Sequence, residues 1–167
     1  MNRRKEATIL ERRAGALIGA SPVPGSGSLP GTEADQRLVG RVLLEHKFTR
    51  NGRYRLTRHT FDKLKVAADS AGEIPVFVIR FVPEKVELAV VETPWLTDLK
   101  LEVGIRRTIA ARGASAMIGA FEYVTTALPQ KGHKVLSCTV KRPGAEDLLL
   151  TVIGWPALAQ AIVGWTK

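Results

Sequence analysis

Asp35, Glu45 and Lys47 are the residues of this chain whose types and spacing best suit chemistry. Ten positions separate Asp35 from Glu45, and Lys47 follows Glu45 after one intervening residue. Two carboxylates can hold a divalent cation, and a nearby lysine can hold an attacking water. Side chains alternate along a strand, so Glu45 and Lys47 would share one face. The pattern predicts metal-dependent phosphodiester hydrolysis. A solvated surface ion pair of Glu45 and Lys47 is the alternative.

The charge of the chain points to a polyanionic partner. The formal net charge is +9 and the pI is about 10.1, which favours nucleic acid. Basic residues concentrate between positions 37 and 65, where Glu45 and Asp62 are the acids. These basic residues are Arg37, Arg41, Lys47, Arg50, Arg53, Arg55, Arg58, Lys63 and Lys65. Acids inside so basic a segment suggest a metal site within a phosphate-binding surface. A basic surface that only aids solubility is the alternative.

Composition limits the class of protein. A chain of 167 residues with 45% hydrophobic content is long enough for one domain with a real core. The single cysteine, Cys138, excludes an intramolecular disulfide and a cysteine-rich zinc site, and we expect it to be buried. No signal-peptide core and no run as long as a membrane span is present. We therefore expect an intracellular protein, in the cytoplasm or associated with the nucleoid, of cellular or phage origin, with no membrane partner.

The first half of the chain contains clear signals for secondary structure. An apolar stripe predicts a helix over residues 2–19. Prolines and glycines predict a loop without regular structure over residues 21–31. Residues 39–48 predict a strand. The Asn-Gly pair at residues 51–52 predicts a two-residue hairpin turn leading into residues 54–56.

A capped helix and two strands follow. Thr57 is suited to cap a helix over residues 58–71, which Gly72 ends. Residues 74–82 and 85–91 predict two strands.

The pattern after Pro94 is weaker. Residues 101–117 predict a helix, although two glycines interrupt it. Residues 134–140 and 147–153 predict two strands joined by a turn at residues 142–144. Residues 156–163 predict a closing helix with proline in its first turn.

This order of elements predicts an α/β fold with a central mixed β-sheet flanked by helices. Residues 1–93 would form a nuclease core. Residues 94–167 would form an α+β extension, which either completes the sheet or forms a small subdomain of unknown role.

Several short motifs also occur together in one order. They are Glu6, Pro24-Gly-Ser-Gly27, Asp35-Gln-Arg37, Glu45-His-Lys47-Phe-Thr49, Tyr54-Arg-Leu56, the helix through Phe61 and Leu64, and Gly72-Glu-Ile-Pro75-Val-Phe-Val-Ile79. With these motifs the chain resembles the phage and archaeal Holliday-junction-resolvase-like branch of the restriction-endonuclease-like, or PD-(D/E)xK, nuclease superfamily. The resemblance covers roughly residues 5–82, and the region after residue 95 matches no motif.

The resemblance implies a restriction-endonuclease-like core and a set of site residues. Asp35 and Glu45 would be ligands of Mg²⁺ or Mn²⁺, with the backbone carbonyl of His46 as a third ligand. Lys47 would orient the attacking water or help to deprotonate it, and would offset the developing charge on the phosphate. Glu6 would be the acid on the first helix, binding a second ion or a metal-bound water.

Two of these assignments have rivals in the sequence. Glu33 competes with Asp35 as the first ligand, because it replaces the small residue that usually stands there. Glu11 competes with Glu6 as the acid on the helix.

A further set of residues is expected to contact DNA. Arginines fix the position of the phosphate backbone without reading sequence, and a glycine-flanked serine lets backbone N–H groups approach a phosphate. The candidates are Ser26, Arg37, Arg50, Arg53, Arg55 and Arg58.

The expected function is that of a Mg²⁺-dependent endodeoxyribonuclease acting on branched DNA, as a Holliday junction resolvase does. Paired cuts in a symmetric four-way junction imply a homodimer with twofold symmetry. Two alternatives remain open: a nicking, repair or restriction-type endonuclease on duplex DNA, and a non-catalytic DNA-binding protein with the same fold.

Overall fold

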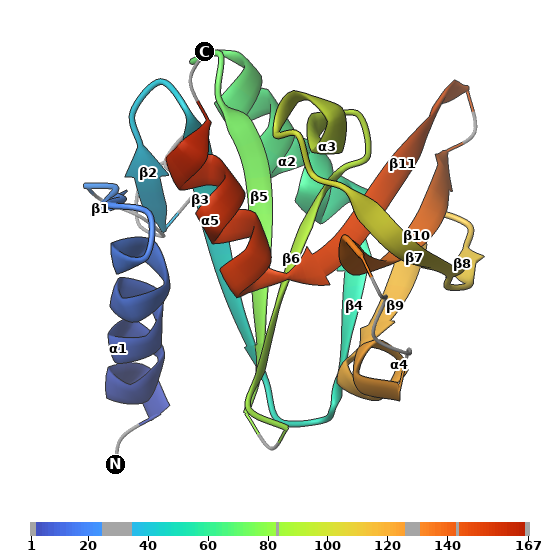
Figure 1. Cartoon of the computed structure of the whole chain (residues 1–167), viewed down its shortest axis with the longest axis horizontal. Coiled ribbons are helices and arrows are strands. Elements are labelled where there is room, and N and C mark those ends of the chain that lie inside the picture. Colours follow the sequence, from blue (N-terminus) through green and yellow to red (C-terminus); the bar gives the residue numbers. More distant parts are fainter. Residues whose placement is uncertain (1–2, 25–34, 83, 126–130, 143, 166–167) are drawn as a thin grey trace.

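The computed structural model describes residues 3–24, 35–82, 84–125, 131–142 and 144–165 (Figure 1), and of residues 3–7, 105, 142 and 145 it describes the backbone only. The helices are α1 (Arg3–Ala16), α2 (Arg58–Asp69), α3 (Trp95–Asp98), α4 (Ala120–Thr125) and α5 (Trp155–Gly164). The strands are β1 (Ser21–Pro22), β2 (Gln36–Leu38), β3 (Val42–Thr49), β4 (Arg53–Thr57), β5 (Ile74–Phe81), β6 (Val86–Glu92), β7 (Val103–Thr108), β8 (Ala111–Arg112), β9 (Ser115–Gly119), β10 (His133–Arg142) and β11 (Ala145–Gly154).

A mixed eight-stranded sheet is the centre of the fold. Its strand order is β1-β2-β3-β5-β6-β11-β10-β7, and a second sheet has the order β4-β9-β8. The pairs β3–β5 and β7–β10 are parallel, whereas the other neighbouring pairs are antiparallel. Helices pack on both faces of the large sheet (Figure 1). The predicted α/β class with a central mixed sheet flanked by helices is therefore confirmed.

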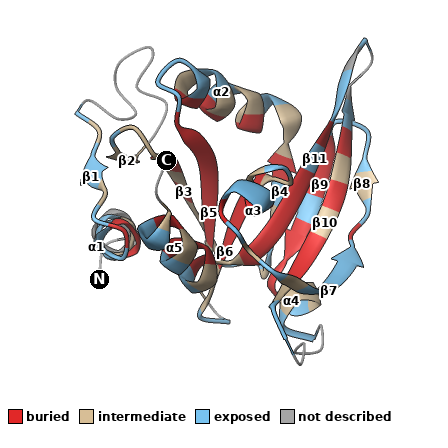
Figure 2. Cartoon of the chain, turned by 45° about the horizontal axis from the view of Figure 1, so that its top comes forward, coloured by how far each residue is buried: buried red, intermediate tan, exposed pale blue. Residues whose placement is uncertain are grey.

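Each face of the large sheet has its own apolar core. Side chains of α1, α3 and α5 pack on one face, and α2 packs on the other face together with the small sheet. Figure 2 shows that β5 is buried along most of its length. Its sequence is apolar almost throughout, as expected of a strand covered on both faces.

The helix predicted after Thr57 is confirmed as α2. The Thr57 hydroxyl accepts a hydrogen bond from the Thr60 N–H at 3.2 Å, which satisfies one N–H of the first turn. Phe61, Leu64 and Ala68 are buried on the inner face of the helix. The predicted strands that follow are confirmed as β5 and β6.

The prediction for the segment before β3 is wrong in two places. Residues 39–41 form a turn from β2 into β3 instead of the start of one long strand. Gly40 allows this turn because its φ is +69°, and its N–H donates to the Glu73 carboxylate at 3.0 Å. Ser21–Pro22 pairs with β2, although a loop without regular structure is predicted there. The rest of that loop, residues 25–31, lies outside the described residues.

The hairpin predicted at residues 51–52 is also wrong. The chain does turn there, with Gly52 at a φ of +62°. However, β4 does not return along β3. β5 pairs along the whole of one edge of β3 and β2 pairs with its first three residues on the other edge, whereas β4 pairs with β9 in the small sheet. The turn signal is local, but the pairing partner is decided by strands distant in sequence.

The helix predicted over residues 101–117 is the largest error. This segment forms β7, β8 and β9. Gly113 makes the turn between the last two strands with a φ of +54°. Met117 is exposed on β9 between buried Ala116 and Ile118. The ladders to β4 and β10 stabilise the strands, and these contacts are not visible in a local pattern.

The C-terminal half continues the large sheet. The strands predicted at residues 134–140 and 147–153 are confirmed as the antiparallel pair β10–β11, and the closing helix is confirmed as α5. Because β11 pairs with β6, residues 94–167 supply strands to the same sheet as residues 1–93. Cys138 is buried, as predicted, and burial raises the pKa of its thiol to about 11. No helix in the described ranges has the length and apolar character needed to cross a membrane.

A close contact fixes α1 against the edge of the sheet that carries β2. A Cβ atom on Gly15 would lie 2.1 Å from Oε1 of Gln36, a buried side chain. The same oxygen lies 2.9 Å from Nε2 of His46 on β3. Glycine at position 15 therefore lets the helix approach a polar contact between β2 and β3.

We predict that Gly15→Ala lowers the free energy of unfolding by about 1–3 kcal/mol, the usual cost of overpacking. Alanine normally stabilises a helix relative to glycine by about 0.5–1 kcal/mol, so the sign of the effect is diagnostic. The matched control is Gly164→Ala in α5, where a Cβ meets no atom within 4 Å. Urea denaturation of both variants measures the difference, and a Gly15→Ala protein as stable as the wild type would contradict the contact.

Candidate functional site

Asp35 is held where the β2–β3 ladder ends. Its N–H donates to the Leu44 carbonyl at 2.9 Å, and its carbonyl accepts the Val23 N–H at 3.1 Å. Its Oδ2 accepts the backbone N–H of His46 at 2.7 Å. A carboxylate thus takes the position that the next carbonyl of β2 would occupy, and this places Asp35 beside the middle of β3.

Glu45 and Lys47 project from the same face of β3. In the register with β5 they lie opposite Phe77 and Ile79, two buried residues of the apolar core. The Lys47 ammonium forms an ion pair with Oε1 of Glu45. The Glu45 side chain is 16% exposed and that of Lys47 is 38% exposed. The predicted same-face arrangement is present, in a setting more buried than a solvated surface pair.

The protonation of this pair depends on its surroundings. Burial raises the pKa of Glu45, the hydrogen bond from Lys47 lowers it, and the Asp35 charge raises it again, with a net upward shift. Burial alone would lower the pKa of Lys47, but the hydrogen bond and charge of Glu45 outweigh burial and raise it. Burial and the Asp35 charge thus disfavour a second carboxylate beside Asp35, while Glu45 holds Lys47 in its charged form.

Glu11 of α1 is electrostatically coupled to these residues. Burial raises the pKa of its carboxyl, the charge of Asp35 raises it further, and Lys47 lowers it. We call Glu11, Asp35, Glu45 and Lys47 the acid–lysine cluster.

The position of Glu6, the preferred acid in the sequence, differs from that of Glu11. Five residues along an α-helix correspond to about 7.5 Å of rise and about 140° of rotation. The backbone positions 6 and 11 therefore lie at different heights and on different sides of α1. The side chain of Glu6 lies outside the described residues, as does all of Glu33. The charge of Glu11 is coupled to those of Asp35 and Lys47, which favours this rival as the acid on α1.

His46 lies on the other face of β3. Its ring is buried and contacts Gln36, and burial lowers its pKa from the ordinary 6.5 to about 4. Its backbone N–H points to Asp35. The N–H and C=O of one residue in an extended strand point to the same neighbour, so the His46 carbonyl is also directed to the edge that Asp35 occupies.

Tyr54 on β4 completes the apolar side of the cluster. Its ring packs against Phe77 with the centroids 5.7 Å apart. Burial raises the pKa of its hydroxyl, Lys47 lowers it and Glu45 raises it, so the ring lies close to the ion pair.

The donor set fits a hard divalent cation. Asp35, Glu45 and the His46 carbonyl supply oxygen atoms only, and Mg²⁺ is commonly bound by one or two carboxylates together with water and substrate phosphates. Among the residues that the structure describes, no three His, Cys, Asp or Glu side chains lie together as a ready ligand group.

The predicted DNA-binding residues separate into two kinds. Arg37 forms an ion pair of 3.0 Å with Glu73, which is buried, and Arg58 forms one of 3.3 Å with Asp62 and donates to the Glu146 carbonyl. Both arginines therefore support the fold.

The other predicted DNA-binding arginines are exposed to solvent. Arg50, Arg53 and Arg55 are exposed in or near β4. Ser26 lies outside the described residues.

A groove on the outer face of the small sheet extends this basic surface. It has a volume of about 640 Å³. Its lining residues are Arg53, Arg55, Arg107, Ile109, Ala110, Arg112, Ser115, Met117 and Glu122. Sequence reasoning missed Arg107 and Arg112, because their segment predicts a helix. The number of arginines in residues 105–112 was the available signal.

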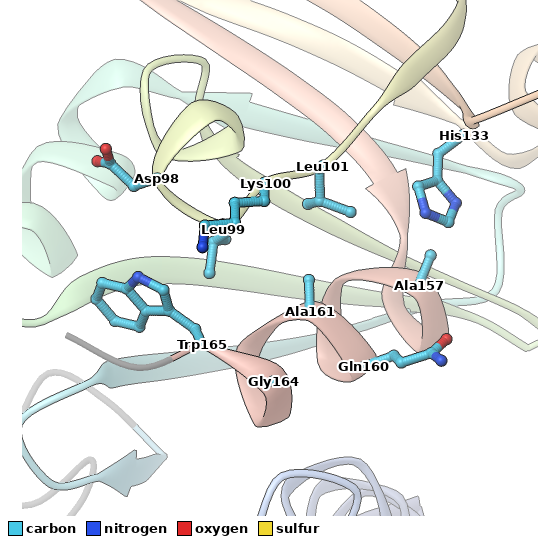
Figure 3. A pocket seen from close by; sticks show the side chains of 10 residues that line it. All are labelled: Asp98, Leu99, Lys100, Leu101, His133, Ala157, Gln160, Ala161, Gly164 and Trp165. Carbon is cyan, nitrogen blue, oxygen red and sulfur yellow. The ribbon is translucent and has the colours of Figure 1, made fainter.

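A second pocket of about 370 Å³ lies apart from these residues. Figure 3 shows it between α5 and the connection from α3 to β7, with the side chains of Leu101, His133 and Trp165 around it. No member of the acid–lysine cluster lines this pocket. It is therefore a separate feature of the C-terminal half.

No protein-family model matches the chain, and a comparison with curated proteins finds no match.

We predict a specific loss of stability on acidification that depends on His46. The unfolded chain binds a proton at this residue near pH 6.5, whereas the folded protein resists protonation until about pH 4. The contribution of His46 to the free energy of unfolding is therefore fully present above pH 6.5. It falls by about 2 kcal/mol between pH 7 and pH 5. Urea denaturation in the presence of chelator measures it. His46→Gln, which retains a donor for Gln36, should lose that part of the pH dependence. An identical pH dependence in both proteins would contradict the prediction.

Proposed function

We propose that the protein is a Mg²⁺- or Mn²⁺-dependent endodeoxyribonuclease of the PD-(D/E)xK kind. The observation that supports the proposal is that Asp35 accepts the His46 N–H of β3, while Glu45 and Lys47, the residues on either side of His46, form an ion pair. Glu11 is coupled to the same residues. Three carboxylates and one lysine, partly withdrawn from water within a chain of net charge +9, form an arrangement suited to a cation and a phosphate together.

Each residue has a role that follows from its position. Asp35 and Glu45 hold the ion, with the His46 carbonyl as a further ligand. The bound ion supplies Lewis-acid stabilisation of the charge that develops on the phosphate. The Lys47 ammonium, which contacts Glu45, orients the attacking water and offsets phosphate charge. Tyr54 and Phe77 keep one side of the pair dry, which strengthens these electrostatic interactions.

The proposed substrate is branched DNA, and the proposed assembly is a homodimer. The basic surface supports binding to a DNA backbone. The preference for a four-way junction and the dimer rest on the resemblance of residues 5–82 to junction-resolving nucleases. Nicking or restriction-type cleavage of duplex DNA uses the same site residues and is the alternative within the same chemistry.

Lys47→Ala should lower the rate of DNA cleavage at least 100-fold, because the phosphate and the attacking water lose their fixed positive charge. The rate is measured with Mg²⁺ on a labelled four-way junction and on a linear duplex of matched sequence. Lys63→Ala, a charge removal on the exposed side of α2, is the matched control and should cut at the wild-type rate. Chelator should abolish cleavage in every protein.

Comparing cleavage of the junction with cleavage of the duplex distinguishes the substrate preference from the cleavage chemistry. Paired symmetric cuts in the junction alone support a resolvase. Cutting of both substrates retains the nuclease and removes the junction preference. Cleavage by Lys47→Ala at the wild-type rate refutes the catalytic assignment. Binding of both DNAs with no cutting by the wild type favours a non-catalytic DNA-binding protein.

The identity of the acid on α1 is tested by comparing two isosteric variants. Glu11→Gln should lower the cleavage rate and raise the Mg²⁺ concentration needed for half-maximal activity, because Glu11 is coupled to Asp35 and Lys47. Glu6→Gln should leave both quantities close to those of the wild type. A loss confined to Glu6→Gln would reverse the assignment.

A further inference from the structure

The groove on the small sheet gathers arginines from three separate parts of the chain. We call Arg53, Arg55, Arg107 and Arg112 the arginine groove, with Ser115 and Glu122 beside them. The first two arginines come from β4, which follows the acid–lysine cluster in sequence. The other two come from β7 and β8, in the half of the chain that matches no motif.

Strand register explains why these side chains converge. Arg53 and Arg55 alternate with Tyr54 and Leu56 along β4, so the arginines lie on the outer face while the apolar residues face the core. On the neighbouring strands, Arg55 is paired with Met117 and Arg112 with Ser115. The face of β4 that carries Tyr54 is therefore turned toward the acid–lysine cluster. The face that carries Arg53 and Arg55 lines the arginine groove.

The charge of the groove is unbalanced. Four guanidinium groups line it against the one carboxylate of Glu122. Within the described ranges, no carboxylate forms an ion pair with Arg53, Arg107 or Arg112. Arg55 donates from Nε to the Ser115 hydroxyl at 3.3 Å, which orients its guanidinium.

A phosphodiester backbone is the ligand that this chemistry fits. Guanidinium forks bind phosphate oxygens in a bidentate manner, and successive phosphates along one strand suit several arginines in a row. Apolar residues are the minority among the residues that line the groove: Ile109, Ala110 and Met117 lie beside four arginines.

We infer that the arginine groove binds the backbone of a DNA duplex outside the segment that is cut. This assigns to β7 and β8 the task of holding DNA, and it gives the region after residue 95 a role. The identity of the polyanion rests on the proposed nuclease function, whereas the phosphate chemistry of the groove does not.

The test is binding to a labelled 30-base-pair DNA duplex, measured by fluorescence anisotropy. Chelator is present so that no cutting occurs. The variants are Arg107→Gln and Arg112→Gln, both at exposed positions. The matched control is Arg106→Gln, an exposed neighbour on β7 that does not line the groove. Thermal melting checks that each variant is folded.

Each groove variant should weaken binding at least threefold at 100 mM salt. It should also reduce the slope of log K against log salt by about 1, so that raising the salt from 50 to 200 mM lowers the affinity of the variant by roughly fourfold less than that of the wild type. Arg106→Gln should bind as the wild type does. Equal effects of all three variants, no effect of any, or no duplex binding by the wild type would each overturn the inference.

The same proteins separate this inference from the nuclease proposal. If the wild type binds through Arg107 and Arg112 but never cuts with Mg²⁺, the groove stands and the nuclease fails. If the wild type cuts through Lys47 but the groove variants bind normally, the nuclease stands and the groove fails.

Discussion

The hydrogen bond from the His46 N–H to the Asp35 carboxylate is the contact on which the candidate site depends. It forms where β2 stops pairing with β3, so the Asp35 side chain supplies the next hydrogen bond to β3 in place of the backbone. This brings an acid from before β2 beside Glu45 and Lys47. On the opposite face of β3, the His46 ring is fixed by Gln36, and Gly15 makes room for the helix that carries Glu11. One strand thus joins the polar cluster to the packing of α1.

The two faces of β4 connect the candidate site to the rest of the molecule. Its inner face contributes Tyr54, which packs on Phe77 and shields the ion pair, and its outer face contributes Arg53 and Arg55 to the groove. β9 holds this strand in place from the C-terminal half. The second half of the chain therefore extends the central sheet and also supports a strand next to the proposed active site.

Sequence patterns predicted the elements whose signals are local. Thr57 and the apolar stripe behind it defined α2, and the apolar run of β5 defined a strand buried on both faces. The same-face placement of Glu45 and Lys47 followed from strand alternation. Long-range pairing was not predictable in this way. The turn at Gly52 is present, yet β4 pairs with β9, a strand distant in sequence. The sequence offers Glu11 only as a rival to Glu6, since it does not give the rotation of α1.

The most direct test of the central claim is to locate the metal in crystals grown with Mn²⁺, using its anomalous scattering. The account predicts one peak bounded by the carboxylates of Asp35 and Glu45 and the carbonyl of His46, with Lys47 displaced from the Glu45 oxygen that the ion takes. A crystal in which Mn²⁺ binds elsewhere, or in which Lys47 keeps its ion pair with Glu45 and no peak lies beside Asp35, would contradict the account.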